Sequence, residues 1–488
     1  MTCIASAYTT YQKWSTDPIV IVYAPLLLPV STIPFPAITI CPLVKTRANL
    51  VNLTEALEMI SNNITLDDEI WKLSEPYSAN NISQMLNQVS LSFIEVMEMC
   101  SFQLEPIACY KLMANTLLDE GICYTFNALP ANETYREDVS TDFFGLRAPK
   151  TSTTWSRETG YRTARIASFP RQGLSSGELN GAFFGLKTAR KNHDPLCSGP
   201  FTGYKVSIHP PDEIPVIGER FLRLSQMNVL LVNVKPQIIR SSQSLKNISP
   251  KGRSCYFEDE RYLRYFRRYN QINCAHECIS NLTLSKCGCV KFSMPRLNDT
   301  PVCGTDKLDC FRTIFIDMYS DRRLREICDC KPPCNSITYD TEVSHLKFNF
   351  HKYIEALSFS MPGYGGYDIT AISVGYKERH FLALYRRELV SVVDAIAKLG
   401  GLFSLALGSS ALSIAEIFYY CFIRPLRRAT NRLYIRTSDY SHNLIFSRMN
   451  LVNSSHFPLK WRKMIFLDYD QSTNIYRHCR TPTLCSSL

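Results

Sequence analysis

One segment near the C-terminal end of the chain is long and apolar enough to cross a lipid bilayer. It runs from Leu399 to Ile423, and Glu416 is its only charged residue. At a rise of about 1.5 Å per residue, an α-helix of this length spans the hydrocarbon core. The pattern predicts a membrane helix that begins near Leu389 and ends near Ile423. Lys and Arg residues are balanced on its two sides, so they do not fix its orientation.

A second uncharged run, residues 18–44, is interrupted by several prolines. Because proline removes a backbone donor and opposes a continuous helix, we expect extended chain entering a sheet rather than a second membrane span. Residues 1–12 are apolar to weakly polar and predict the last turns of a helix. A signal peptide is the alternative, but the segment has no basic region and no clear cleavage site.

Between these two ends, the apolar positions predict an α+β domain. Residues 50–115 have a helical pattern, whereas the short alternating runs at 204–208, 229–234 and 369–374 are typical of strands. Apolar residues within 310–328 follow one face of a helix. We therefore expect strands and helices in one large domain, with one disulfide-rich helical subdomain.

Cysteines and glycosylation sequons indicate an oxidising compartment. The chain has 19 cysteines, and ten of them lie between Cys255 and Cys334. A zinc site is the competing interpretation, but the Cys-x-Cys pairs here are less usual for zinc than Cys-x2-Cys pairs. Disulfides are favoured because seven Asn-x-Ser/Thr sequons are interleaved with the cysteines. The sequons begin at Asn52, Asn63, Asn81, Asn132, Asn247, Asn281 and Asn298.

The formal net charge of +10 is concentrated in the C-terminal tail. Residues 424–488 contain eleven Lys and Arg residues and three acidic residues. A basic segment next to a membrane span is typical of contact with an anionic inner leaflet, and we do not expect a nucleic-acid partner. Together with the sequons and cysteines, this pattern predicts that the large part before the helix is extracellular and that the tail is cytoplasmic.

Four segments carry motifs of one known protein family. They are Ile33–Pro42 (IPFPAITICP), Gly121–Asn127 (GICYTFN), the cysteine pattern of residues 255–334, and Leu399–Glu416 (LGGLFSLALGSSALSIAE). In this order they resemble the degenerin/epithelial sodium channel family, also known as amiloride-sensitive sodium channels. The aromatic and basic segment 253–269 is most similar to pickpocket-type subunits.

The resemblance implies a fold and its division along the chain. We expect an α+β membrane protein with a large disulfide-rich extracellular domain, built from a β-sheet palm and a helical thumb and finger, on two transmembrane helices. The expected parts are a remnant of the first transmembrane helix (1–13), whose remainder this sequence lacks, the extracellular domain (14–388) with its thumb (255–334), the second helix and pore (389–423), and the basic cytoplasmic tail (424–488).

The resemblance also implies a disulfide pattern. The implied pairs are Cys41–Cys123, Cys100–Cys109, Cys255–Cys334, Cys274–Cys330, Cys278–Cys328, Cys287–Cys310 and Cys289–Cys303. Such crosslinks would stiffen a lever that carries motion from the extracellular domain to the pore. Cys197 remains unpaired in this scheme, either as a buried thiol or as a link to another subunit.

By the same resemblance, Gly408, Ser409 and Ser410 match the family's selectivity filter. Small residues allow three helices to approach, and carbonyl or hydroxyl oxygens can replace the water shell of a sodium ion. The alternative is a packing face of small residues, comprising Gly400, Gly401, Ser404 and Gly408.

Two further positions are assigned to the pore. Glu416 is an acid inside an apolar run, which indicates a hydrated pathway that attracts cations. The alternative is a carboxyl group hydrogen-bonded to a neighbouring helix. Ala397 falls where the family has a small residue at its outer gate, and the resemblance implies that a bulky side chain there would hold the pore open.

We therefore expect a subunit of a trimeric, amiloride-sensitive sodium channel of the plasma membrane, gated by a ligand or by force. Its partners would be membrane lipid and related subunits in a homotrimer or heterotrimer, with sodium as the permeant ion and with no cofactor or metal site. Ser31 and Thr32 replace the histidines of acid-sensing members, so proton gating is not expected. No catalytic constellation indicates an enzyme. The alternatives are a non-conducting regulatory subunit and a single-pass, cysteine-rich cell-surface receptor.

Overall fold

The computed structural model describes residues 18–51, 79–140, 154–162, 168–195, 199–304, 307–356, 366–408 and 411–428, with Ala5, Tyr8, Thr9, Tyr11, Gln12, Thr16 and Thr430. The chain divides into two compact units. We call Thr9–Ser391 the disulfide-rich domain, and we call Met1–Tyr8 with Val392–Leu488 the C-terminal unit.

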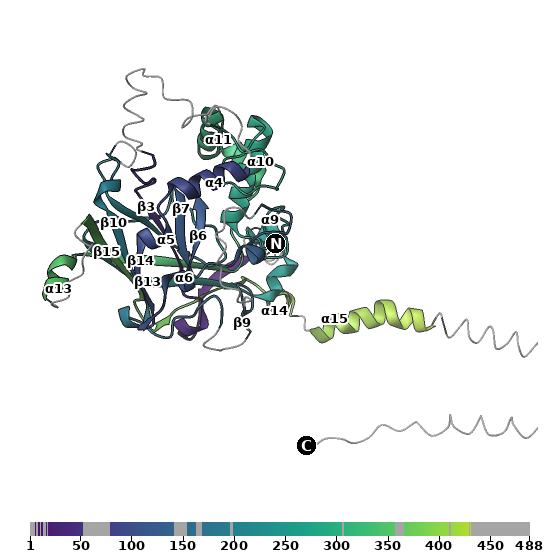
Figure 1. The fold of residues 1–488 in the computed structure, drawn as a ribbon. Helices are drawn as coiled ribbons and strands as arrows, with labels where there is room; N and C mark the ends of the chain where they lie inside the picture. The colour runs from purple at the N-terminus through teal and green to yellow at the C-terminus, as the bar shows by residue number, and fades with distance from the viewer. Residues whose placement is uncertain are drawn as a thin grey trace, which may run out of the picture. The chain divides into compact units, whose positions relative to one another are not determined.

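A mixed sheet of eight strands is the largest element of the disulfide-rich domain among the described residues (Figure 1). Its long strand β13 runs parallel to β15 and β17 and antiparallel to β14. The sheet order is β1 (Ile19–Tyr23), β17 (Leu384–Glu388), β13 (Asn228–Ser241), β15 (Tyr367–Tyr376), β10 (Ala182–Ala189), β4 (Met97–Phe102) and β5 (Glu105–Pro106), and β14 (Ser336–Lys347) pairs with β13.

A second, five-stranded sheet is entirely antiparallel. Its order is β12 (Leu222–Ser225), β11 (Gly203–His209), β3 (Ala37–Pro42), β7 (Gly121–Phe126) and β6 (Met113–Leu118). Two short pairs complete the strands described: β2 (Leu28–Pro29) with β16 (His380–Phe381), and β8 (Trp155–Ser156) with β9 (Gly160–Tyr161). The strands predicted at 204–208, 229–234 and 369–374 are confirmed as parts of β11, β13 and β15.

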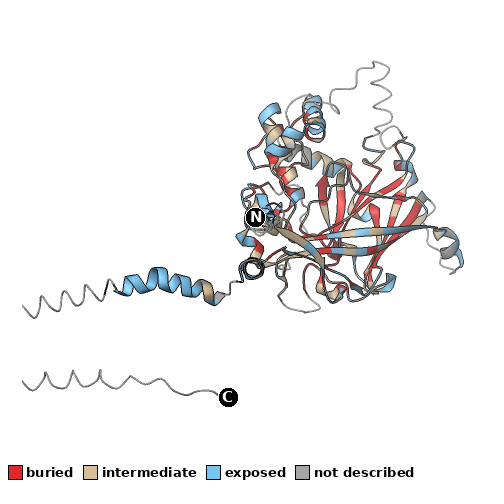
Figure 2. Ribbon diagram, turned by 180° about the vertical axis from the view of Figure 1, so that it is seen from behind, coloured by how far each residue is buried: buried red, intermediate tan, exposed pale blue. Residues whose placement is uncertain are grey.

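Buried residues of both sheets form the main core, and Figure 2 shows the buried stretches of their strands in red. Phe35 is completely buried, and the rings of Phe102 and Tyr376 each lie 5.4 Å from its ring in edge-on contact. The carbonyl oxygen of Pro34 accepts hydrogen bonds from the hydroxyl groups of Tyr339 and Tyr376. The uncharged run 18–44 is therefore extended chain that leads through β1, β2 and β3 into the core, as its prolines predict.

The helical prediction for residues 50–115 is confirmed in part and is wrong where the chain forms strands, at residues 97–102, 105–106 and 113–115. Residues 52–78 lie outside the described part of the chain, and α4 (Ala79–Val89) and α5 (Phe93–Val96) are helical. From Met97 onward the chain forms β4, β5, the short helix α6 (Cys109–Leu112) and β6. Short apolar runs do not separate strands from helices by periodicity, and here sheet pairing with β10 and β7 decides.

Three helices build the thumb, residues 255–334: α10 (Gln271–Cys287), α11 (Leu308–Ser320) and α12 (Arg322–Cys328). The side chain of Asn270 caps α10 by accepting a hydrogen bond from the amide of Asn273, and Gly288 ends the helix with a φ of 74°. The helix predicted from the apolar spacing within 310–328 is confirmed as α11, on which Ile314 and Met318 are buried, whereas Phe315 of the same apolar set is 42% exposed.

Among the residues that the structure describes, seven disulfides crosslink the disulfide-rich domain. They are Cys41–Cys123, Cys100–Cys109, Cys255–Cys334, Cys274–Cys330, Cys278–Cys328, Cys287–Cys310 and Cys289–Cys303. These are the same pairs that the family resemblance implies. Five of them lie within the thumb, where they tie α10 to α11 and to the chain around α12. Cys197 lies outside the described residues.

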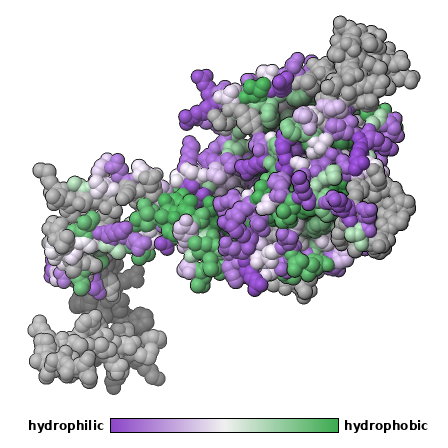
Figure 3. All heavy atoms as spheres, turned by 90° about the vertical axis from the view of Figure 1, so that its left-hand side faces the viewer, coloured by the Kyte–Doolittle hydropathy of each residue, from purple (hydrophilic) through white to green (hydrophobic). Residues whose placement is uncertain are grey.

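Several short elements connect these layers. They are the 3-10 helices Val30–Thr32, Glu178–Asn180, Arg190–Asn192 and Gln243–Asn247, and the helices α7 (Ala131–Thr134), α9 (Pro250–Arg253) and α13 (Phe350–Ala356). Hydrophilic residues cover much of the face of the disulfide-rich domain seen in Figure 3, with hydrophobic residues in smaller groups between them.

The C-terminal unit contains α14 (Val392–Leu407), α15 (Ala411–Phe418) and a π-helical turn, Tyr419–Ile423, that continues as α-helix to Arg428. The single continuous helix expected over 399–423 is not observed, because α14 ends before Gly408. Among the described residues, the structure has no helix that combines the length and the apolar character needed to span a membrane.

Candidate functional site

The helix of the C-terminal unit is interrupted at Gly408, the first residue of the expected filter triplet. Gly408 has a φ of 61°, a left-handed conformation that costs a residue with a side chain about 1–2 kcal/mol. It therefore ends α14 as glycine ends many helices. Ser409 and Ser410 lie outside the described residues. The interruption thus falls where the resemblance puts the selectivity filter.

Ending a helix at this point has an electrostatic consequence. The last four carbonyl groups of an α-helix have no partner within the helix, and the C-terminal end carries a partial negative charge. For α14 these are the carbonyl groups of residues 404–407, directly before Gly408. Such a helix end is suited to contact a cation in a water-poor environment.

Small residues follow one face of α14 toward the interruption. Ala397, Gly400, Gly401, Ser404 and Gly408 recur at helical spacing, and all five are exposed. A Cβ atom built on any of the three glycines would meet no other atom within 4 Å. The face is therefore open in a single chain, and it can approach either a pore axis or another helix closely. Ala397 lies about three turns before Gly408.

Glu416 lies on α15, on the other side of the interruption, and its side chain is exposed. The neighbouring apolar side chains Leu412, Ile417 and Phe418 are exposed as well. Glu416 therefore lies on a different helical segment from α14, which ends directly before Gly408.

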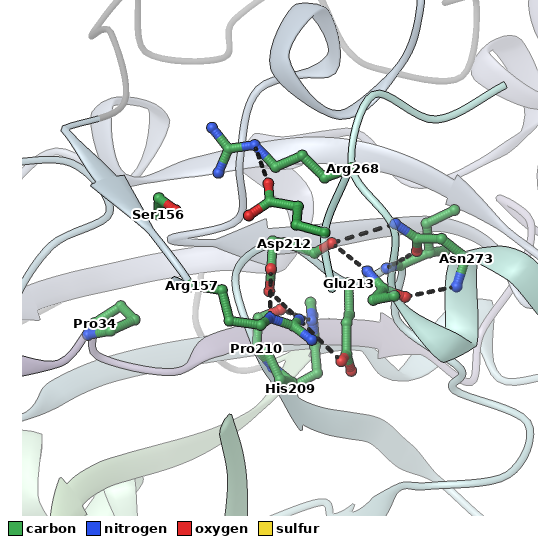
Figure 4. A network of polar contacts seen from close by, with 12 residues as sticks. Pro34, Ser156, Arg157, His209, Pro210, Asp212, Glu213, Arg268 and Asn273 are labelled. Carbon is green, nitrogen blue, oxygen red and sulfur yellow. Dashed lines mark hydrogen bonds and ion pairs between the residues drawn. The ribbon is translucent and has the colours of Figure 1, made fainter. Parts of the chain in front are cut away.

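In the disulfide-rich domain, a buried ionic network lies where the loop after β11 meets the start of α10 (Figure 4). Arg157, in the turn between β8 and β9, donates through Nε and Nη2 to the two carboxylate oxygens of Asp212, at 2.9 and 2.7 Å. Its Nη2 atom also lies 3.2 Å from Glu213 Oε1. The side chain of Arg157 is 5% exposed, so this bidentate pair is shielded from water.

The same loop is held by the N-terminal end of the thumb helix α10. The side-chain amides of Asn270 and Asn273 both donate to the carbonyl oxygen of Asp212, at 2.9 and 3.3 Å. The Asn273 side chain also accepts from the amide of Ile214. The loop 210–214 therefore joins three parts of the domain: the β8–β9 turn, the five-stranded sheet and the thumb.

Burial shifts the titration of two groups in this loop in opposite directions. Burial raises the pKa of Glu213 to about 7, against the opposing charge of Arg157. Burial lowers the pKa of His209 to about 4, and its ring is bonded to Thr39 Oγ1 and to the carbonyl oxygen of Pro210. Neither residue is among the sites predicted from the sequence. The acidic pair Asp212-Glu213, which follows β11 after two prolines, is the sequence signal that marks this loop. Nothing in the sequence around Arg157 indicates its role.

The base of the thumb contacts β1. A small cluster of Leu245, Cys255, Phe257 and Cys334 packs against Ile19 at the start of β1. β1 pairs with β17, and the amide of Leu389 donates to the carbonyl oxygen of Pro18. Because β17 leads along the chain toward α14, the Cys255–Cys334 disulfide lies beside the strand pair through which the chain leaves the domain.

The sequons that the structure describes lie on the surface. Asn132, Asn247, Asn281 and Asn298 are exposed, and Asn81 lies in α4. Asn52 and Asn63 fall outside the described residues. Exposure permits glycosylation at the first four positions, which stays a prediction. Among the described residues, no group of His, Cys, Asp or Glu side chains has the arrangement of a metal site.

Comparison with known proteins supplies the remaining observation. The family model described as amiloride-sensitive sodium channel matches residues 1–420. The chain belongs to the amiloride-sensitive sodium channel family. Members of this family are ion channels and not enzymes.

Several curated relatives of this channel family are similar over most of the chain. Pickpocket protein 28 of Drosophila melanogaster is 26% identical over 85% of this chain and 71% of its own length. The sodium channel protein Nach of the same species is 25% identical, over 86% and 79%. Acid-sensing ion channel 1C of Danio rerio is 23% identical, over 80% and 70%. The degenerin and pickpocket resemblance of the sequence motifs is thereby confirmed.

Proposed function

We propose that this chain is a pore-forming subunit of a trimeric, sodium-selective, amiloride-sensitive channel of the plasma membrane. The disulfide-rich domain faces the outside of the cell and residues 424–488 face the cytoplasm. The segment from α14 through Gly408–Ser410 to α15 crosses the membrane and lines the pore. A ligand or mechanical force on the outer domain gates it.

The helix interruption at Gly408 is the observation that supports this proposal most. A helix that only anchors a receptor needs no interruption, and in a bilayer any unpaired backbone group is costly. Irregular backbone at that depth is tolerated where it lines a hydrated pathway. The carbonyl groups at the end of α14, together with the hydroxyl groups of Ser409 and Ser410, would then replace part of the water shell of sodium.

The small residues on one face of α14 would form the gate of the pore. Three copies of α14 with Ala397, Gly400 and Ser404 toward a common axis can approach closely enough to close the pore at its outer end. Glu416, beyond the filter, adds negative charge that attracts cations. A bulky residue at position 397 would separate the helices and favour the open state.

The test is an electrical recording of the Ala397→Val variant in cells with little background conductance. We expect a sodium current that amiloride blocks. The matched control is Ala395→Val on the same helix, because a position two residues away points to a different side and should leave the current unchanged. Surface labelling of both variants establishes that equal amounts of protein reach the membrane.

Two outcomes would revise the proposal. Surface protein without current on its own, but with an effect on the current of a co-expressed pickpocket-type subunit, would indicate a regulatory subunit. Surface protein without current in either setting would contradict a channel role and favour a cell-surface receptor.

A further inference from the structure

Arg223 on β12 contacts aromatic rings and no acidic group. Its guanidinium group lies over the ring of Phe201, 4.5 Å from the ring centre, and 5.4 Å from the centre of the Phe221 ring. Within the part of the chain that the structure describes, the Arg223 side chain makes no hydrogen bond and no ion pair. The residue is exposed, so its N–H donors are available to a partner outside the chain.

Three other arginines of this domain also lie over aromatic rings, but their N–H groups are used within the fold. Arg136 and Arg261 each donate a hydrogen bond to a backbone carbonyl oxygen. Arg253 is buried and donates to three backbone carbonyl oxygens. Arg223 differs from these residues, because the ring contacts restrict its position while its capacity to donate hydrogen bonds is unused.

The five-stranded sheet holds these groups in place. Arg223 pairs with Lys205 of β11, and the Lys205 ammonium group lies 4.9 Å from the centre of the Phe221 ring. Phe221 packs against a cluster that contains the Cys41–Cys123 disulfide. One of the two rings is therefore anchored in the fold. The other, Phe201, is 55% exposed and presents apolar surface beside the guanidinium group.

The neighbouring lysines already have an acidic partner. Lys205 and Lys45 both bind the carboxylate of Glu120, at 2.5 and 2.8 Å. Arg223 therefore adds a positive charge that no carboxylate in this group neutralises. A polyanion such as a nucleic acid binds to a row of free cations. A single free guanidinium group next to an exposed ring is suited instead to one carboxylate that carries an apolar neighbour.

We propose that Arg223 and Phe201 form a binding site for an organic carboxylate, namely an acid whose carboxylate is attached to an apolar body. The guanidinium group donates paired hydrogen bonds to the carboxylate, and the apolar body covers the exposed ring of Phe201. Two sources have this chemistry: a free fatty or aromatic acid, and the C-terminal residue of a peptide that ends in an apolar side chain. The site lies in the disulfide-rich domain and does not depend on the pore.

The experiment measures binding to the purified full chain in detergent by fluorescence anisotropy. The probe is the peptide Gly-Ser-Gly-Phe with a neutral fluorophore at its N-terminus, made with either a free C-terminal carboxylate or a C-terminal amide. We expect the acid form to bind at least about tenfold more tightly at low salt, because the amide cannot form the paired bonds to a charged acceptor. Arg223→Gln should remove this difference, and Phe201→Ala should weaken the binding of both forms.

Competition by small molecules distinguishes the two sources of the carboxylate. The competitors are 3-phenylpropanoate and hexanoate, with 3-phenylpropanamide as the neutral counterpart. If the two free acids displace the probe at concentrations similar to those of unlabelled peptide, the ligand is a small organic acid. If only the unlabelled peptide displaces it, the ligand is a peptide C-terminus, because contacts with the peptide backbone then contribute to binding.

Arg264→Gln is the matched control. It removes the same charge from another exposed arginine of the domain and should leave the tenfold difference intact. Thermal unfolding of each variant establishes that it is folded. Equal binding of the acid and amide forms by the unchanged chain, an unaltered difference in Arg223→Gln, or an equal loss in Arg264→Gln would overturn the proposal. Because no current is measured, each of these results leaves the proposed function untouched.

Discussion

The disulfide-rich domain and the C-terminal unit are stabilised in opposite ways. The domain has completely buried residues such as Phe35, Phe126 and Phe184 between its two sheets, and seven disulfides across it. In α14 and α15, no side chain that the structure describes is buried, although apolar residues dominate both helices. The domain thus contains its own core, whereas the helices expose to their surroundings the kind of surface that lipid or further copies of the chain would cover.

The difference between the two regions predicts which property of the protein a mutation changes. In the domain, the effect of a substitution follows from contacts within the chain. In the C-terminal unit, the effect follows from what the helix faces, so stability of the domain and behaviour of the helix should change independently. Three variants or pairs of variants test this separation, beginning with the largest expected effect.

The largest effect is expected from Phe35→Ala. Removing a completely buried aromatic side chain that contacts Phe102 and Tyr376 costs about 3–5 kcal/mol in free energy of unfolding. We expect a lower unfolding temperature of the full chain in detergent and a strong loss of surface protein. Ile396→Ala on α14, where the side chain is 66% exposed, should leave the unfolding temperature of the domain unchanged. Equal destabilisation by both changes would show that the two regions are not independent.

A smaller, pH-dependent effect is expected in the loop between β11 and the thumb. Because burial raises the pKa of Glu213 to about 7, its stabilising contribution is complete below its ordinary pKa and is lost as pH rises through 7. Because burial lowers the pKa of His209 to about 4, its contribution is complete above its ordinary pKa of 6.5 and is lost as pH falls toward 4. Between about pH 4.5 and 6.5 the two dependences oppose each other.

The unfolding temperatures of the two single variants should therefore change with pH in opposite directions. Glu213→Gln leaves the His209 dependence, so the unfolding temperature should rise with pH from 4 to 6.5. His209→Gln leaves the Glu213 dependence, so it should fall as pH rises from 4.5 to 7. Each pKa shift corresponds to about 3.5 kcal/mol of unfolding free energy at most, at about 1.4 kcal/mol per pH unit. Thermal unfolding measured from pH 4 to 7 tests this prediction. If the unfolding temperatures of both variants changed with pH in the same direction, the opposite pKa shifts of Glu213 and His209 would be refuted.

The fold of the disulfide-rich domain and that of the C-terminal unit can be predicted from the sequence to different extents. In the domain, alternation predicts β11, β13 and β15, and the prolines of residues 18–44 predict extended chain, because local patterns reflect which face is buried. The strands β4 and β6 escape prediction because a short apolar run becomes a strand only through its partners β10 and β7. Arg157 is equally hidden, since its partners lie 55 and 56 residues away in the sequence.

In the C-terminal unit the sequence predicts the apolar segment but not its interruption. Residues 399–423 contain Glu416 as their only charged residue, and a glycine inside a helix often remains helical, as Gly400 and Gly401 do. Only the backbone angles distinguish Gly408 from these two residues. The motif Gly408-Ser409-Ser410 points to the position by family resemblance, whereas its physical basis, the end of α14, is visible only in the structure.

The smallest effect in energy is expected from one substitution made at two glycines. Gly400→Ala lies within α14 where a Cβ meets nothing within 4 Å, so the better helix former should stabilise the helix by up to about 1 kcal/mol. Gly408→Ala has the same open space but a φ of 61°, so it should cost about 1 kcal/mol or more and favour a continuous helix. In the Ala397→Val background, Gly408→Ala should therefore reduce the preference of the current for sodium over potassium, whereas Gly400→Ala should keep it. If Gly408→Ala kept full selectivity at equal surface expression, the helix end would not form the ion site, and the small residues of α14 would be a packing face only.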